Sequence, residues 1–386
     1  MADFFVDAPL GRGLKDGSDG DNAASSIYAM LTGWSPVASA GETCWLTGIE
    51  TITDSQGMFR TDVAIGTDGD TSASPISVIA CDSDWNPTRD GYTMSGSPAD
   101  PPNNMIYHRD GIYWYFYGIK ITGSYTGHGI YIVGNETYIT LDSLHINGAG
   151  INGIELHGND APKILIKNCR ITNCTGDGIN SVITGSVINN YIVGNGGYGL
   201  KIFSATPLTH VRGNIIALNG GNGIGCTTTY YSNSDISNNI LYKNSENGID
   251  FGTGPSNSNN NLIYDNLICL NGEYGINYGT DTSATVPDGT NRIWHNCMYA
   301  NVSGASNNKI IEYITNSSED LNIDMTGHGM IDPDNEDFRI DRNNCEFDFL
   351  PRTYDWDADT PINITYANCG PMYENAFRAR RVIITS

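Results

Sequence analysis

Residues 168–179 have the sequence NCRITNCTGDGI, and two patterns within this stretch recur along much of the chain. The first pattern is a glycine followed by Ile or Leu, and its glycines are Gly129, Gly153, Gly178, Gly199, Gly223, Gly248 and Gly275. The second is a pair of asparagines separated by four residues, found at Asn168/Asn173, Asn190/Asn195, Asn214/Asn219, Asn239/Asn244, Asn266/Asn271 and Asn296/Asn301. Successive glycines lie 24, 25, 21, 24, 25 and 27 residues apart. Both patterns therefore mark one repeating structural unit.

The residue types within each unit decide between the repeat folds that share this period. A period in the twenties is typical of leucine-rich repeats and of β-helices, but the chain has no leucine skeleton. Each unit instead holds short β-branched runs such as Ile164-Leu165-Ile166 and Ile215-Ile216, separated by Asn and Gly. Short strands joined by Asn and Gly corners predict a parallel β-helix, in which equivalent residues of successive coils stack in columns about 4.8 Å apart. We expect corner asparagines to bridge their side chains to the backbone of the next coil, and the repeat glycines to supply the positive φ of sharp corners.

Two further segments carry a resemblance to a known group of proteins. Residues 15–24, KDGSDGDNAA, resemble the opening Asp-Gly-x-x-Asp-Asp-x-Ala motif of right-handed parallel β-helix proteins related to pectate lyases and phage tailspikes. Gly20 stands where that motif has its second paired acid. Residues 332–340 resemble the Asp-Pro…Asp-Phe-Arg-Leu segment that closes many such proteins. The resemblance implies an all-β, right-handed parallel β-helix with an irregular C-terminal closing segment.

The same resemblance implies a short N-terminal capping helix, which we expect over residues 23–31 with Asp21 or Asn22 as its N-cap. We expect four regions along the chain. These are the entry and cap at 1–33, irregular first coils at 34–122 with a long loop at 82–104, regular coils at 123–302, and terminal coils with a tail at 303–386.

Charge and composition exclude several partners. The chain has 20 basic and 43 acidic residues, a net charge of -23, which disfavours nucleic acid and anionic membranes. No run approaches the roughly 20 apolar residues that cross a bilayer, and the first residues lack the basic start of a secretion signal. The nine cysteines are odd in number and several lie inside repeats, so we expect buried, mostly reduced thiols and synthesis in a reducing compartment.

Column alignment gives one candidate pair of catalytic carboxylates. Glu246 and Glu273 each precede a repeat glycine by two residues in neighbouring coils, so their backbones should lie roughly 5 Å apart. We expect Asp250 and Asp265 near them. The alternative is two exposed corner acids without a catalytic role. The column after the Gly-(Ile/Leu) pair contains Glu155 and Lys201, but these lie two coils apart.

No metal site or cofactor is predicted, because no spacing of acids or histidines is typical of one. Two groups of turn acids offer the oxygen ligands that calcium prefers. They are Asp62, Asp68 and Asp70, and Asp82 and Asp84. The alternative is that they are ordinary turn aspartates, since Gly, Ser and Thr surround them.

An aromatic run forms the second candidate site. In residues 112–117, IYWYFY, strand alternation should turn Ile112, Trp114 and Phe116 inward. The same alternation places the tyrosines outward at Tyr113, Tyr115 and Tyr117. Such a row can stack on sugar rings or on a neighbouring subunit. The alternative is burial beneath the 82–104 loop.

The β-helix proteins that this sequence resembles include lyases, hydrolases, adhesins and virion parts, so the fold alone does not give the function. The favoured hypothesis is a non-enzymatic structural or recognition protein on a virion surface, made in the host cytoplasm, contacting other virion proteins or a polysaccharide, and open to assembly as a homotrimer. The first alternative is an extracellular polysaccharide lyase or glycoside hydrolase. The second alternative is a bacterial surface adhesin.

Overall fold

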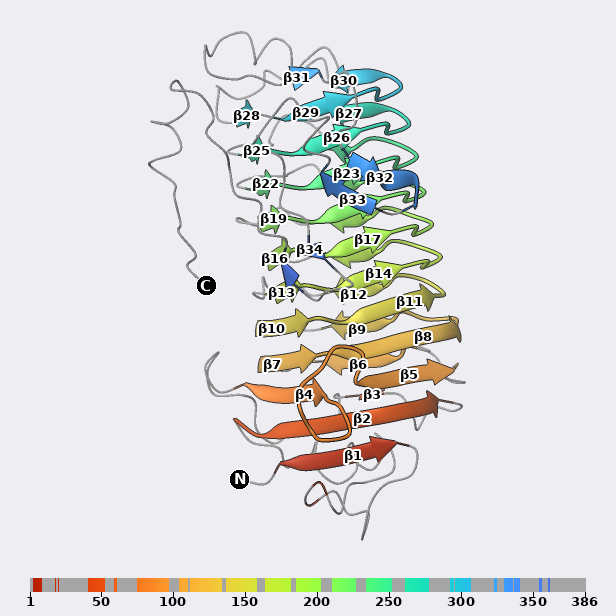
Figure 1. The fold of residues 1–386 in the computed structure, drawn as a ribbon, viewed down its shortest axis with the longest axis vertical. Coiled ribbons are helices and arrows are strands. Elements are labelled where there is room, and N and C mark those ends of the chain that lie inside the picture. Colours follow the sequence, from red (N-terminus) through yellow and green to blue (C-terminus); the bar gives the residue numbers. More distant parts are fainter. Residues whose placement is uncertain are drawn as a thin grey trace.

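The computed structural model describes residues 3–8, 18, 20, 41–52, 59–60, 75–96, 104–109, 112–133, 137–157, 164–181, 185–202, 210–226, 234–251, 261–277, 292–294, 296–306, 323–324, 330–335, 337–340, 354–355 and 360–361. Within them the chain is a parallel β-solenoid, as predicted (Figure 1). The expected capping helix at residues 23–31 lies outside the described residues. No helix among the described residues is long and apolar enough to cross a membrane.

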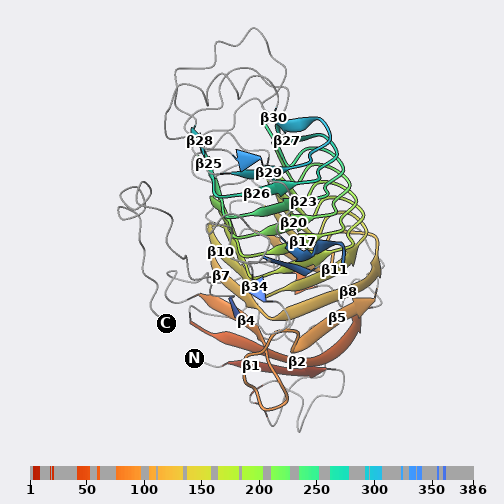
Figure 2. The same cartoon turned by 45° about the horizontal axis from the view of Figure 1, so that its top comes forward.

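Each regular coil contributes three strands, which stack into three rows (Figures 1 and 2). Row A1 contains β1 (Phe4–Ala8), β2 (Thr43–Ile52), β4 (Ile76–Ala80), β7 (Ile112–Tyr117), β10 (Thr137–Asp142), β13 (Ile164–Lys167), β16 (Gly185–Ile188), β19 (His210–Arg212), β22 (Asp235–Ser237), β25 (Leu262–Tyr264) and β28 (Arg292–Trp294). Row A2 contains β5 (Tyr92–Gly96), β8 (Ile119–Tyr125), β11 (His145–Ala149), β14 (Arg170–Thr172), β17 (Tyr191–Val193), β20 (Ile215–Ala217), β23 (Ile240–Tyr242), β26 (Leu267–Cys269), β29 (Cys297–Tyr299) and β31 (Ile323–Asp324). Strand β2 pairs with both rows, so A1 and A2 form one 21-stranded sheet.

The third row, sheet B, is a separate ten-stranded parallel sheet. It contains β3 (Phe59–Arg60), β6 (Ile106–Arg109), β9 (Ile130–Val133), β12 (Ile154–His157), β15 (Ile179–Ser181), β18 (Leu200–Ile202), β21 (Ile224–Cys226), β24 (Ile249–Asp250), β27 (Tyr274–Asn277) and β30 (Gly304–Ser306). Inward side chains of the three rows form one continuous apolar core, which includes Ile171, Ile179 and Ile192.

Asparagine side chains connect the coils, as the sequence predicted. Asn195 donates its backbone N–H and its Nδ2 to Oδ1 of Asn219, both at 3.0 Å. Asn219 in turn donates Nδ2 to the Ile192 carbonyl at 3.1 Å. The same bonds recur from Asn190 to Asn296 and from Asn195 to Asn301, where the asparagines are almost fully buried. These two ladders satisfy amide groups that water cannot reach.

The structure corrects the first member of this pattern. The ladder positions of that coil are occupied by Cys169 and Cys174, whose backbone N–H groups donate to Asn190 and Asn195. Asn168 and Asn173 precede them by one residue and adopt positive φ values of 56° and 55°. They are corner residues, because Asn tolerates the left-handed conformation better than other non-glycine residues.

The repeat glycines have a different role from the one predicted. Positive φ is found at other corner residues, including Leu218 and Lys243, and not at Gly178 or its equivalents. A Cβ at Gly178 would lie 2.7 Å from the carbonyl oxygen of Gly199 and 2.9 Å from Nδ2 of Asn195. Glycine is therefore required there because successive coils approach too closely for a side chain.

The predicted long loop at 82–104 is partly wrong. Residues 92–96 form β5, which pairs with β2 and β8 in the solenoid wall. The preceding connection is a tight turn, with a bridge between Cys81 and Pro87. The hydrophobic face of β5, with Tyr92 and Met94 both fully buried, explains why this segment belongs to the core.

The C-terminal closing segment lies against the side of the solenoid. Strands β32 (Met330–Asp332) and β33 (Asp337–Ile340) pair antiparallel around the 3-10 turn η4 (Pro333–Asn335). A second short hairpin joins β34 (Tyr354–Asp355) to β35 (Thr360–Pro361). Asp334 accepts hydrogen bonds from Tyr242 Oη at 2.6 Å and Lys243 Nζ at 2.5 Å, and Figure 1 shows β32 and β33 in front of row A2.

The surface of row A2 next to Tyr242 is apolar although it faces away from the core. We call this cluster the outer seam, and it contains Tyr191, Val193, Ile215, Ala217, Ile240, Tyr242, Leu267 and Cys269. Every member is at most 5% exposed, so other parts of the chain cover it. The contacts of Asp334 place the C-terminal turn at this seam.

The ladder geometry gives a stability prediction. Asn219→Ala removes one acceptor and one donor inside the ladder, leaving the Asn195 N–H and the Ile192 carbonyl without their side-chain partner. Leaving such buried groups unpaired should destabilise the protein by about 2 kcal/mol or more, measured as a shift in the denaturant midpoint. The matched control is Ser245→Ala at an exposed site. Equal effects of the two variants would contradict a stabilising ladder.

Candidate active site on sheet B

Two columns of side chains cover the outer edge of sheet B. The sheet-B column is set by the strand register and contains Tyr107, Tyr131, Glu155, Asn180, Lys201, Gly225, Asp250 and Asn277. The edge column consists of the residues that precede the repeat glycines, namely His128, Asn152, Asp177, Tyr198, Asn222, Asn247 and Tyr274. Neighbours within each column lie about 4.8 Å apart along the backbone.

Aromatic rings begin the site at its N-terminal end. The rings of Tyr107 and Tyr131 stack with centroids 5.6 Å apart, and the imidazole of His128 stacks on Tyr131 at 5.3 Å. Burial lowers the pKa of His128 to about 4, so this ring is neutral near pH 7. The three rings form an uncharged stacking surface.

Glu155 follows these rings and is mostly buried, with 9% of its surface exposed. Its Oε2 accepts a hydrogen bond of 2.6 Å from Asn152 Nδ2 and lies 3.9 Å from His128 Nδ1. Burial raises the pKa of Glu155, the Asn152 bond opposes this, and the negative charge of Asp177 raises the pKa further. A carboxyl group with a raised pKa is suited to donate a proton.

Asp177 lies between Glu155 and the basic residue of the site, Lys201. Asn152 Oδ1 accepts the Asp177 N–H at 2.7 Å, and Asp177 Oδ1 accepts the Tyr198 N–H at 2.7 Å. Asp177 Oδ2 lies 3.7 Å from Lys201 Nζ. Burial raises the pKa of Asp177, and the bond from Tyr198 and the Lys201 charge partly offset it.

Sequence reasoning missed Asp177 because it aligned the column after the Gly-(Ile/Leu) pair and the column two residues before the glycine, but not the column directly before the glycine. Glu155 and Lys201 are two coils apart, as predicted, but Asp177 occupies the coil between them from the edge column. The available signal was its position directly before Gly178. A Cβ at Gly197 would collide with the Asp177 carboxylate, so the glycine of the next coil makes room for the acid.

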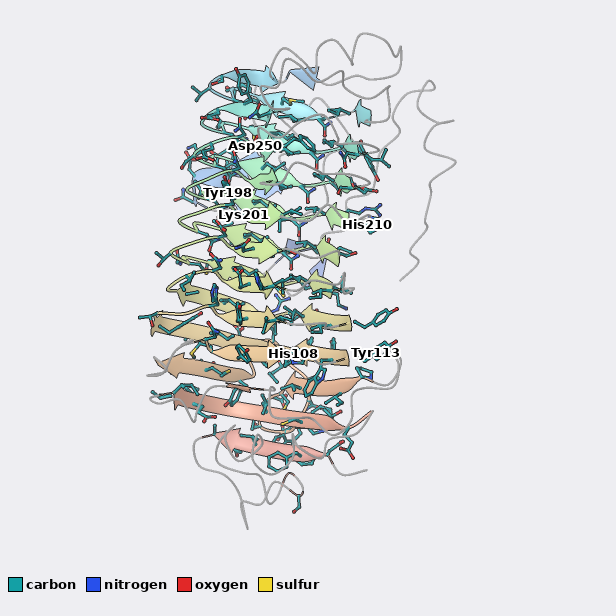
Figure 3. All side chains as sticks on the ribbon, turned by 180° about the vertical axis from the view of Figure 1, so that it is seen from behind. His108, Tyr113, Tyr198, Lys201, His210 and Asp250 are labelled. Carbon is teal, nitrogen blue, oxygen red and sulfur yellow. The ribbon has the colours of Figure 1, made fainter. Side chains whose placement is uncertain are left out.

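Tyr198 occupies the centre of the site, close to Lys201, and Figure 3 shows both on the same side of the solenoid as Asp250. Lys201 Nζ lies 5.4 Å from the centroid of the Tyr198 ring. The ring packs where Gly221 and Gly225 leave space, since a Cβ at Gly221 would collide with it. Burial, and then the charges of Glu246 and Asp250, raise the pKa of Tyr198.

The predicted pair Glu246 and Glu273 lies at the C-terminal end of the same face. Their backbones are adjacent, since the Glu273 N–H donates to the Glu246 carbonyl at 3.0 Å. Glu273 is exposed and accepts a 2.9 Å bond from Asn247. Partial burial raises the pKa of Glu246, and the charges of Glu273 and Asp250 add to that shift. Asp250 is therefore close to the pair, as predicted, and the catalytic role of the pair stays a prediction.

Asp265 does not join this group. It lies at the corner between β25 and β26 with φ of 55°, away from sheet B. The expectation that it approaches Glu246 and Glu273 is wrong, because Asp265 precedes the ladder residue Asn266 instead of a repeat glycine.

The predicted tyrosine row lies on row A1, a different sheet from the carboxylates. Trp114 and Phe116 are buried, as predicted, and pack at 5.3 and 5.9 Å from the ring of His108, a histidine inside the core. The outward tyrosines Tyr113, Tyr115 and Tyr117 are half-buried. Tyr115 Oη donates to Asp142 at 3.0 Å, and its ring stacks with that of Tyr117 at 6.2 Å.

Tyr113 has a partner in the next coil. Its ring stacks on that of Tyr138 with centroids 4.6 Å apart and an angle of 9°. Both residues have positive φ, 58° for Tyr113 and 63° for Tyr138. This conformation is unusual for bulky side chains, so the pair is held by the surrounding coils.

Of the predicted calcium-binding aspartates, Asp82 and Asp84 lie in the described residues, and both belong to a turn. Asp82 Oδ1 accepts the backbone N–H groups of Asp84 at 2.9 Å and Asn86 at 3.0 Å. These bonds lower the pKa of Asp82 and are typical of an aspartate that stabilises a turn. Asp62, Asp68 and Asp70 lie outside the described residues. Within the described part of the chain, no three His, Cys, Asp or Glu side chains gather as a metal site.

Five cysteines are free and buried in the structure, as expected for reduced thiols. They are Cys44, Cys81, Cys169, Cys174 and Cys269. Burial raises the pKa of Cys169 to about 12 and of Cys174 to about 11, so both remain protonated and unreactive near neutral pH. The side chains of the other four cysteines are not among those that the structure describes.

Comparison with known proteins supports the fold. The family model described as "Right handed beta helix region" matches residues 128–291. The structure is similar to pectate lyase Pel9A, with a TM-score of 0.59, 15% identity, and coverage of 95% of this chain and 94% of the lyase. The solenoid is thus a right-handed parallel β-helix, as predicted.

Two other solved structures are similar at lower scores. A rhamnogalacturonan lyase has a TM-score of 0.45 and 12% identity, covering 90% of this chain and 96% of its own. The A-module of the Azotobacter vinelandii mannuronan C-5 epimerase AlgE6 has a TM-score of 0.43 and 14% identity, covering 69% and 87%. No curated protein matches the sequence. At 15% identity, the similarity to the pectate lyase establishes the fold alone.

The raised pKa of Glu155 predicts how stability depends on pH. A carboxyl with a raised folded-state pKa adds stability below its ordinary value of 4.5, and this stability is lost as the pH rises through the folded-state value. Glu155→Gln keeps an acceptor for Asn152 and should raise the melting temperature near neutral pH. The gain should shrink as the pH falls below the ordinary value. Glu273→Gln, at an exposed site, is the control, and a lower melting temperature for Glu155→Gln at neutral pH would contradict the assignment.

Proposed function

We propose that the protein binds an extended polysaccharide along the outer face of sheet B. The observation that carries this proposal is the column of aromatic and polar residues from Tyr107 to Asn277, which is interrupted at Gly225. The column crosses eight consecutive strands of sheet B, a length of roughly 34 Å at the sheet spacing. That length accommodates several sugar units of one chain.

The side chains along this face suit a carbohydrate ligand. The stacked rings of Tyr107, Tyr131 and His128 offer an apolar surface to the C–H face of a sugar. Beyond them, Asn180, Lys201 and Asp250 supply donors and acceptors for hydroxyl groups. A few polar groups beside an aromatic surface are typical of small-molecule and sugar sites.

We retain the hypothesis that this binding serves recognition on a virion surface, with assembly as a homotrimer as one form of it. It is supported by the buried free thiols, which suit synthesis in a reducing compartment. A bacterial surface adhesin with the same binding face is the alternative setting. Both settings use the sheet-B face in the same way.

A second function, cleavage of the bound chain, is favoured by one specific observation. Glu155 and Asp177 come from neighbouring coils, are mostly buried, and both have raised pKa values. Glycosidases use a carboxylic acid with a raised pKa together with a second carboxylate. Within this hypothesis, Glu155 donates the proton to the leaving oxygen and Asp177 is the second group. This assignment replaces Glu246 and Glu273 as the favoured pair because those two are more exposed.

Binding to the sheet-B face is tested with Tyr131→Ala. Removing the central ring of the aromatic group should weaken binding to a polysaccharide selected from a bacterial polysaccharide array by roughly tenfold, measured by titration calorimetry. Tyr113→Ala on row A1 is the matched control and should leave the affinity unchanged. Weaker binding by Tyr113→Ala, with an unchanged affinity for Tyr131→Ala, would instead assign binding to the tyrosine row predicted from the sequence.

Cleavage is tested by the release of reducing ends or unsaturated sugars from the polysaccharide that binds. Glu155→Gln should lower this release by about 100-fold or more if Glu155 is the acid. Glu273→Gln should change it by less than about threefold, since its carboxylate is exposed. Loss in Glu246→Gln and Glu273→Gln, with full activity in Glu155→Gln, would return the catalytic role to the pair predicted from the sequence.

A further inference from the structure

A column on row A1 places a serine, a histidine and an aspartate in three consecutive coils. The strand register aligns Ser186 of β16 with His210 of β19, and His210 with Asp235 of β22. At the sheet spacing, Ser186 and Asp235 are therefore roughly 10 Å apart with His210 midway between them. The backbone register thus places in one column the three residue types that hydrolases use as nucleophile, base and acid.

All three side chains point away from the core. The residues that follow them, Val187, Val211 and Ile236, belong to the buried core of the solenoid, so strand alternation turns Ser186, His210 and Asp235 outward. Figure 3 shows His210 well apart from Tyr198 and Lys201. This column is separate from the sheet-B site.

Asp235 is held firmly in its column. Its Oδ1 accepts a 2.9 Å hydrogen bond from Ser237 Oγ, and its Oδ2 accepts a 3.3 Å bond from Tyr264 Oη. Arg212 forms a close ion pair with Oδ2. Only 8% of Asp235 is exposed. The carboxylate is thus fixed by neighbours on three strands, as expected of a group that orients a base.

One ring nitrogen of His210, Nδ1, is buried and has no hydrogen-bond partner among the described residues. An unpaired buried nitrogen is unfavourable, and Asp235 lies on the next strand. A rotation of the imidazole that brought Nδ1–H to Asp235 would supply the missing bond and leave Nε2 for Ser186 on the preceding strand. Catalytic hydrogen bonds are often completed only when substrate binds.

We propose that Ser186, His210 and Asp235 form a hydrolytic site for a carboxylic ester. Ser186 Oγ attacks the carbonyl carbon while His210 Nε2 takes its proton. The bond from the carbonyl carbon to the alcohol oxygen then breaks, and the alcohol leaves with the proton from His210. Water, activated by His210, cleaves the acyl-serine ester, releases the carboxylic acid and restores Ser186.

Arg212 gives this site a means of stabilising negative charge on the reacting oxygen. It is the other outward residue of β19, and its side chain is 44% exposed beside Asp235. A guanidinium has five N–H donors, so the ion pair with Asp235 leaves donors for a second oxygen. Asp235 acts as a positioning residue, because it reaches the ester only through His210.

Hydrolysis of p-nitrophenyl acetate by the full chain, with labelling by a fluorophosphonate probe, tests the proposal. Wild-type protein should turn over the ester, and peptide mass spectrometry should find the probe on Ser186. Ser186→Ala should abolish labelling and lower turnover by at least about 100-fold, and His210→Gln by a similar factor. Asp235→Asn should lower kcat while leaving KM nearly unchanged, which a general loss of structure would not do.

Matched variants separate this site from background reactivity. Ser245→Ala removes an exposed serine on another face, and His145→Gln removes a histidine that pairs with Asp90 but has no aligned serine in the neighbouring coils. Both should keep wild-type turnover. Wild-type labelling or turnover in Ser186→Ala protein, with an unchanged circular dichroism spectrum, would overturn the proposal. Absence of both in the wild type would overturn it as well.

Discussion

The fold depends on amide groups that pair from one coil to the next. Buried asparagines such as Asn195 and Asn219 each join a backbone N–H to a side-chain oxygen and a side-chain nitrogen to a carbonyl. Because these groups are away from water, each coil is stable only when its neighbours complete the bonds. The pairing also fixes the register, and the register is what brings side chains from distant parts of the sequence into the columns of both candidate sites.

The repeat period and the β-branched runs were sufficient to predict a parallel β-helix and the ladder, but the roles of single corner residues were not predictable. Leu218 adopts positive φ and Gly178 does not, since conformation at a corner is set by contacts with the next coil and not by local preference alone. The offset of Asn168 from the ladder has the same origin. Likewise β5 lacks the repeat pattern, and only its pairing with β2 and β8 places it in the wall.

The candidate site was partly accessible from sequence because columns follow from the period. That reasoning placed Glu246 beside Glu273 and separated Glu155 from Lys201. It could not find Asp177 as the link between them, since the link needs the hydrogen bonds of Asn152 and the space left at Gly197. Burial was equally inaccessible, because the exposure of a carboxylate depends on side chains of the neighbouring coils. The raised pKa of Glu155 is a property of the assembled stack.

The outer seam bears on the order in which the chain folds. Its apolar residues come from β17, β20, β23 and β26, so the surface does not exist until those strands have stacked. Asp334 reaches Tyr242 across 92 residues of sequence, a contact whose loop-closure entropy is too large for an early step. The C-terminal hairpin therefore docks late, and in a chain still emerging from the ribosome the seam around Tyr242 lacks its contact with the C-terminal turn until residue 334 is available.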